Sequence, residues 1–112
     1  MNQISKKNAE HYNWGGSCDG WRLVNSKEIS VIHEKMPPGT SEKSHYHKTA
    51  RQFFFILEGN ASIEAEEKIY NLEKHEGIEI LNGIRHRFFN SSDKPVEFMV
   101  ISIPSTISDR HE

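Results

Sequence analysis

Short apolar stretches recur at regular intervals along this chain, and this pattern constrains the fold more than any other feature. The stretches occupy residues 28–36, 53–57, 61–65, 69–72, 78–81, 86–89 and 96–103. Turn-forming residues separate several of them, namely Gly59-Asn60, Glu66-Glu67, Asn82-Gly83 and Ser91-Ser92-Asp93-Lys94-Pro95. Regularly spaced short strands with polar turns predict a β-sandwich or barrel rather than alternating strands and helices. Since no segment has the apolar period of a convincing amphipathic helix, the predicted class is all-β.

The chain has the length of one domain. Its 112 residues can close one hydrophobic core but not a second. We expect the barrel to occupy residues 10–104, with loosely held tails at residues 1–9 and 105–112. The charges nearly balance, with 14 basic and 16 acidic side chains and a net charge of -2. This balance gives no electrostatic reason to expect a nucleic acid partner.

Cysteine content and hydropathy bear on the cellular compartment. Cys18 is the single cysteine and cannot form an internal disulfide, which suits a reducing compartment. The first ten residues are polar and mixed in charge, and no segment approaches the ~20 apolar residues of a membrane span. The sequence therefore predicts a cytoplasmic protein without a membrane partner.

Three histidines carry the clearest chemical signal. His45 and His47 are two residues apart, so in an extended strand both point to one face while Tyr46 points to the other. His86 stands at the start of a later predicted strand. Three imidazoles that converge can hold zinc, nickel, iron, manganese or copper. Spacing alone leaves a second interpretation, in which each histidine is a surface residue or a hydrogen-bonded core residue.

Two longer patterns surround these histidines. The first is Gly39-(x5)-His45-Tyr46-His47-(x4)-Gln52-(x6)-Gly59, and it resembles the first cupin motif with glutamine at the glutamate position. The second is Gly83-(x2)-His86-(x3)-Asn90, which resembles the end of the second cupin motif. The resemblance covers roughly residues 29–103. Upstream of His86 the chain departs from the family, with His75 and Leu81 where glycine and proline are usual.

The resemblance implies a fold and a ligand set. Cupins are double-stranded β-helices, or jelly-roll barrels, with a metal ion inside. Carried over position by position, the resemblance implies a single cupin domain that binds one divalent transition-metal ion through His45, His47, Gln52 and His86. The remaining coordination positions would be open to water or to a substrate.

Gln52 is the departure that matters most for chemistry. An amide offers one neutral carbonyl oxygen, whereas a carboxylate offers a negative charge and two oxygens. A metal ion among neutral ligands would keep its full charge, so its affinity for the protein should fall and its attraction for an anionic ligand should rise. Two roles stay open at this stage: Gln52 ligates the metal, or it only hydrogen-bonds inside the barrel.

Other polar residues near the motifs have two interpretations each. Glu42 could supply a base or a hydrogen-bond partner for a ligand, or it could lie on a solvated rim. Arg51 and Arg85 could bind an anionic substrate, or they could pair with surface acids. Asn90 is expected to satisfy backbone groups near a turn.

The aromatic residues suggest contacts beyond a single barrel. Trp14 and Trp21 flank a glycine-rich segment that could cover the barrel mouth, although Trp21 could instead begin a strand and pack in the core or against a second subunit. In the run Phe53-Phe54-Phe55 only alternate side chains can fill one barrel, so a homodimer is expected. Three of the histidines outside the motifs are interpreted as structural, namely His11, His33 and His75.

The sequence is compatible with more than one function. We favour a metal-dependent enzyme that acts on a small oxygenated or anionic molecule by dioxygenation, isomerisation or another Lewis-acid reaction. The alternative is a non-catalytic module that binds or senses a small molecule in the same pocket. A barrel whose histidines no longer hold metal is a third class, and the intact set of three histidines argues against it. No catalytic residue is assigned, because this fold hosts many functions.

Overall fold

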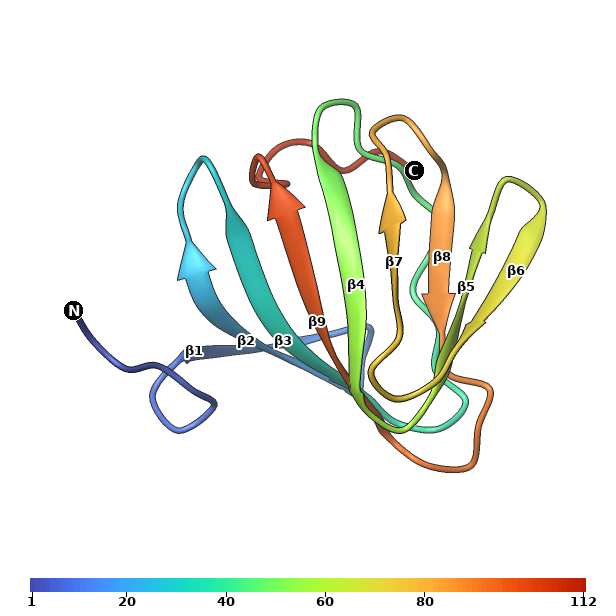
Figure 1. Ribbon diagram of the computed structural model, residues 1–112, viewed down its shortest axis with the longest axis horizontal. Coiled ribbons are helices and arrows are strands. Elements are labelled where there is room, and N and C mark those ends of the chain that lie inside the picture. Colours follow the sequence, from blue (N-terminus) through green and yellow to red (C-terminus); the bar gives the residue numbers. More distant parts are fainter.

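The computed structural model describes residues 1–112 as nine strands without a helix (Figure 1). The strands are β1 (Glu10–Trp14), β2 (Cys18–Asn25), β3 (Ser30–Met36), β4 (Arg51–Glu58), β5 (Ala61–Ala65), β6 (Lys68–Leu72), β7 (Gly77–Ile80), β8 (His86–Phe89) and β9 (Val96–Ile103). The predicted all-β class is confirmed. The structure has no helix that could span a membrane.

The strands form two antiparallel sheets that face each other (Figure 1). The larger sheet has the order β1-β2-β3-β9-β4-β7, and the smaller has the order β6-β5-β8. Strands adjacent in space are often distant in sequence, because β9 lies between β3 and β4. This order brings the end of the chain back beside the segment that contains the first two motif histidines.

The core lies between the two sheets and is built from alternate residues of each strand. On β4, Gln52, Phe54 and Ile56 are buried, while Phe53 and Phe55 face outward. Across the core, Phe88 of β8 stacks on Phe54 with ring centroids 5.4 Å apart. This alternation follows from the two-residue period of a strand, and it turns position 52 toward the same interior as the phenylalanines.

The glycine-rich segment between the two tryptophans is the turn of a hairpin. β1 pairs with β2, and Gly15 and Gly16 adopt left-handed φ values of 56° and 85° in the turn between them. Trp14 faces the interior, whereas Trp21 lies on the outer face between the rings of His11 and His33, at 5.3 and 5.5 Å. The two indoles therefore do not form one cover, and Trp21 is a strand residue.

The C-terminal residues 105–112 differ from the loose tail that the sequence predicts. Tyr46 and His111 exchange two backbone hydrogen bonds, of 2.9 and 3.0 Å. The carboxylate of Asp109 also accepts hydrogen bonds from the loop before β4. The composition of residues 105–112 does not predict this attachment, because the attachment depends on where β9 ends in the fold. Residues 105–112 lie at the end of the barrel where the histidines are found.

Candidate metal centre

The three motif histidines lie together inside the barrel. His45 and His47 come from the extended segment between β3 and β4, and His86 is the first residue of β8. His45 and His86 form an isolated antiparallel bridge, which places their rings 4.5 Å apart. The ring centroid of His47 lies 5.0 Å from that of His45 and 5.7 Å from that of His86. One nitrogen from each ring lies within 4.8 Å of the others, and all three residues are buried.

Each imidazole is held in the same tautomer by a backbone carbonyl. A carbonyl oxygen can only accept a hydrogen bond, so the ring Nδ1 must donate it. The Nδ1 atoms lie 2.7, 2.7 and 2.9 Å from the carbonyl oxygens of Lys43, Asp109 and Ile84, for His45, His47 and His86 respectively. Burial lowers the pKa of all three histidines, that of His45 to about 3. Each ring is therefore neutral at physiological pH, with a lone pair on Nε2.

Two of these lone pairs lack a suitable partner in the protein. Nε2 of His47 is buried and has no hydrogen-bond partner. Nε2 of His86 lies 3.1 Å from Oε1 of Gln52, so two acceptors face each other. Buried acceptors that face one another without a proton are unfavourable, and a cation placed among them removes the penalty. The donor set therefore fits a divalent metal ion.

Gln52 is oriented by a buried serine. Its Nε2 atom donates a hydrogen bond of 3.1 Å to Oγ of Ser102 on β9, the residue opposite it in the strand register. This bond turns Oε1 toward His86. The structure thus brings together all four residues that the sequence suggested as ligands, with the glutamine oxygen on the side of the imidazoles.

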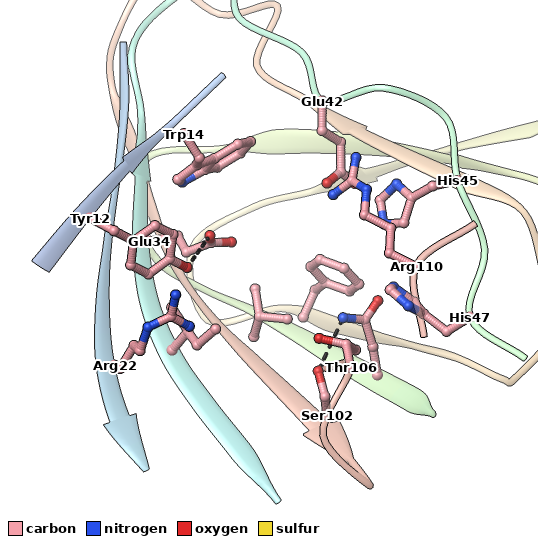
Figure 2. Close-up of a pocket in the computed structure, with 14 residues that line it drawn as sticks. Tyr12, Trp14, Arg22, Glu34, Glu42, His45, His47, Ser102, Thr106 and Arg110 are labelled. Carbon is pink, nitrogen blue, oxygen red and sulfur yellow. Dashed lines mark hydrogen bonds between the residues drawn. The ribbon is translucent and has the colours of Figure 1, made fainter. Parts of the chain in front are cut away.

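A cavity of about 270 Å³ opens beside the histidines (Figure 2). His45 and His47 lie on one side, and Tyr12, Arg22 and Glu34 of β1, β2 and β3 lie on the opposite side, while Gln52 also lines the cavity. Further lining residues include Trp14 of β1, Glu42 of the segment between β3 and β4, and Thr106 and Arg110 of the C-terminal residues. This size is at the low end for ligand pockets, so it suits a small molecule.

Two glutamates in this cavity have unusual acidity. Burial, and then the charge of Glu42, raises the pKa of Glu34 to about 8. Burial also raises the pKa of Glu42 to about 7, although the N–H of Phe88 donates a 2.9 Å hydrogen bond to its Oε1. A carboxyl with a pKa near neutrality can either give or take a proton, which is the property of a general acid or base.

The structure places only some of the polar residues suggested by sequence at the cavity. Glu42 lines the cavity, whereas Arg51 pairs with Glu79 at 3.6 Å and Arg85 donates to the carbonyl of Glu112 at 3.0 Å. The two arginines thus lie outside the cavity. Asn90 has the expected role at a turn: its side-chain amide donates to backbone carbonyls of Met36, Pro37 and Lys94.

Sequence reasoning missed several residues that line the cavity. Glu34 did carry a signal, because it shares the inward parity of Ile32 and Met36 on β3 and is therefore a carboxyl in a core position. Tyr12 and Arg22 carried none, since nothing in the sequence shows that their hairpin crosses the barrel end. Arg110 carried no signal either, because it lies in residues 105–112, which the sequence predicts to be a tail.

Comparisons with known proteins agree with this architecture. A family model described as Cupin domain matches residues 32–102. The curated "Tetracenomycin polyketide synthase protein TcmJ" of Streptomyces glaucescens is 29% identical over 63 residues, which are 56% of this chain and 42% of that protein. The match thus spans less than half of the curated relative.

Solved structures show the same fold at low identity. A predicted oxalate decarboxylase from Thermotoga maritima has a TM-score of 0.84 and 16% identity, over 93% of this chain and 100% of that one. A cupin-superfamily sugar phosphate isomerase from Silicibacter pomeroyi has a TM-score of 0.81 and 18% identity, over 93% and 76% of the two chains. The jelly-roll barrel expected from the motifs is confirmed.

Proposed function

This chain belongs to the cupin family, and from that premise we propose that it is a metal-dependent enzyme acting on a small oxygenated or anionic molecule. One divalent ion would be held by His45, His47, His86 and the carbonyl oxygen of Gln52. The observation that carries the proposal is the set of inward lone pairs, above all the buried Nε2 of His47 that has no partner. Such a set is costly to fold unless a cation occupies it.

The neutral donor set determines what kind of ligand the site would favour. Three imidazoles and an amide suit zinc, nickel, iron, manganese or copper, and none of them cancels the charge of the ion. A bound ion of this kind would supply Lewis acidity toward a coordinated oxygen. Arg22 and Arg110 also line the cavity, so two further positive charges lie near it. These features favour a ligand that carries a carboxylate, an enolate or several oxygen atoms.

The two cavity glutamates support catalysis rather than binding alone. Glu34 and Glu42 lie on the cavity wall with pKa values of about 8 and 7. In isomerisation one group must take a proton from carbon or oxygen and a group must return it, and these two carboxyls could hold that proton. The names of two structural neighbours, a sugar phosphate isomerase and a predicted oxalate decarboxylase, also refer to small oxygenated molecules.

Metal analysis tests the proposal directly. Elemental analysis of the purified protein should find up to one transition-metal ion per chain, and His86→Ala should sharply reduce it. His75→Ala is the matched control, since that ring is outside the cluster and stacks on Phe55 at the outer face. Undiminished metal in the His86→Ala variant would contradict the three-histidine site. Bound metal with ligand binding but no turnover of any small oxygenated acid would favour the non-catalytic module.

A homodimer in the cytoplasm completes the proposal. The outer face of the large sheet carries an apolar row in which Phe53 lies opposite Ile101 and Phe55 opposite Met99. Phe53 is 38% exposed although its strand, β4, pairs with a neighbour on each side. An apolar patch of this kind favours association with a second copy. The free, buried Cys18 suits a reducing compartment.

A further inference from the structure

The segment that contains His45 and His47 is hydrogen-bonded on both edges. On one edge, His45 and His86 exchange backbone hydrogen bonds of 3.0 and 2.8 Å. On the other, Tyr46 and His111 exchange bonds of 2.9 and 3.0 Å. Successive residues of an extended chain direct their backbone groups to opposite edges, so β8 holds one ligand residue while the C-terminal residues hold the residue between the two ligands.

His47 depends on the C-terminal residues more than the other two histidines do. The carbonyls that fix His45 and His86 belong to residues two positions earlier in the same segment, Lys43 and Ile84. The carbonyl that fixes His47 belongs to Asp109, which is 62 positions later in the chain. His47 is also the histidine whose Nε2 has no partner in the protein. Its orientation is thus a tertiary property, while that of the others is local.

The side-chain carboxylate of Asp109 also hydrogen-bonds the residues that follow His47. Its Oδ1 accepts a 2.9 Å hydrogen bond from the N–H of Lys48, and Oδ2 accepts bonds of 3.0 and 2.9 Å from Thr49 and Ala50. These three N–H groups lie between His47 and Gln52, which are both proposed ligands. Hydrogen bonds to an ionised carboxylate are stronger than neutral ones. One residue therefore fixes a ligand ring through its carbonyl and the link to the next ligand through its carboxylate.

We propose that residues 105–112 form a strap that completes the metal site, with Asp109 as the positioning residue for His47. This inference rests on the proposed metal-binding function and adds the element that organises it. The strap also brings Thr106 and Arg110 to the cavity wall, so the segment that orients a ligand lines the cavity as well (Figure 2). Loss of partners that orient metal ligands costs about 10–100-fold in metal affinity.

The first test measures cobalt affinity. Co²⁺ is titrated into the metal-free full chain, and binding is followed by its visible ligand-field absorption with a competing chelator. We expect Asp109→Ala to weaken binding about 10–100-fold and to change the absorption spectrum. Asp109→Asn, which retains one acceptor oxygen, should recover part of the affinity. Asp93→Ala is the control, because it removes the same charge from an exposed turn at the other end of the barrel and should leave binding unchanged (Figure 1).

The second test needs no metal and keeps the two proposals distinguishable. Long-range ¹H–¹⁵N spectra of the metal-free protein report which ring nitrogen of each histidine carries the proton. We expect Nδ1–H for His47 in the native chain and in Asp93→Ala, and loss of that preference in a chain ending at Pro104, with His45 and His86 unchanged. A native His47 tautomer and a native cobalt affinity in both the Asp109→Ala variant and the chain ending at Pro104 would overturn the strap. A native chain that binds no cobalt but shows a strap-dependent His47 tautomer would contradict the metal-binding proposal alone.

Discussion

The hydroxyl of Tyr12 donates a 3.1 Å hydrogen bond to Oε2 of Glu34 across an intervening strand. Tyr12 lies opposite Gly20 in the register of β1 and β2, and Gly20 lies opposite Glu34 in that of β2 and β3. A side chain at position 20 would occupy the space between them, since a Cβ there would overlap the Tyr12 ring. The missing side chain lets a residue two strands away orient a cavity carboxyl (Figure 2).

Gly20→Ala should therefore destabilise the protein by about 1–3 kcal/mol, the usual cost of overpacking a buried site. The expected cause is displacement of the Tyr12 ring, which leaves Glu34 without its donor. Urea unfolding of the metal-free protein measures the effect. In a Tyr12→Ala background the same substitution should cost much less, because the ring is gone, and an equal cost in both backgrounds would show that Gly20 acts otherwise.

Glu34 should make the stability of the metal-free protein fall as pH rises. Its folded pKa of about 8 exceeds its ordinary value of 4.5, so between these values the folded state binds more protons than the unfolded state. Stability then decreases with pH across this window. Glu34→Gln should flatten the dependence, with a remainder from Glu42, whose pKa is about 7. Glu79→Gln, at the exposed pair with Arg51, is the control and should leave the slope unchanged.

The hydrogen bond from Tyr12 opposes this rise, because it favours the charged form of Glu34. Tyr12→Phe should therefore raise the pKa of Glu34 further. The carboxyl carbon resonance of Glu34, followed by NMR in the metal-free protein, measures the change. A lower pKa in the variant would mean that the hydroxyl does not act as the donor.

Gln52→Glu should tighten metal binding by about tenfold or more, since one charged oxygen ligand replaces a neutral one. The same substitution should weaken the attraction of the bound ion for anions. Chelator competition with Co²⁺ measures the first effect. Ser102→Ala tests the orientation of Gln52 separately from its charge, because it removes the group that turns the Gln52 oxygen toward His86. Unchanged affinity in Gln52→Glu would mean that residue 52 only hydrogen-bonds beside the metal.

Arg110→Ala should weaken the binding of a small dicarboxylate to the cobalt-loaded protein by about tenfold, the usual order for a lost hydrogen bond to a charged group. Oxalate is a suitable probe, and isothermal titration calorimetry measures its affinity. Arg51→Ala removes the same charge outside the cavity and should have little effect. Equal losses in both variants would point to a general effect of charge rather than to a contact with Arg110.

Phe53→Glu should convert the proposed dimer to a monomer, because it places a charge within the apolar row of the outer sheet face. Sedimentation velocity measures the change. Ile69→Glu on β6 is the control, since Ile69 is 56% exposed on the smaller sheet. Dissociation by Ile69→Glu and not by Phe53→Glu would place the interface elsewhere.

The sequence by itself predicted the strands from β3 onward and the candidate ligands, but not the hairpin of β1 and β2. Alternation of apolar residues sets which side chains of a strand face the core, and the same two-residue period places His45 and His47 on one face. The presence of Gln52 in place of a carboxylate was also visible, and with it the uncompensated charge of a bound ion. The face to which a strand residue points depends on its neighbours in the chain, so local spacing is enough to read it, whereas Gln52 became a candidate ligand through the resemblance to the first cupin motif.

Only the tertiary structure decided which distant residues meet these ligands. The hydrogen bond from Tyr12 to Glu34 depends on the registers of three strands. The hydrogen bond between Asp109 and His47 depends on where β9 ends in the fold. Neither contact has a local sequence signal, because a hydrogen bond across the fold is set by strand order and register rather than by spacing. The candidate ligands and the possible role of Glu42 were therefore predictable, while the strap and the contact between Tyr12 and Glu34 were not.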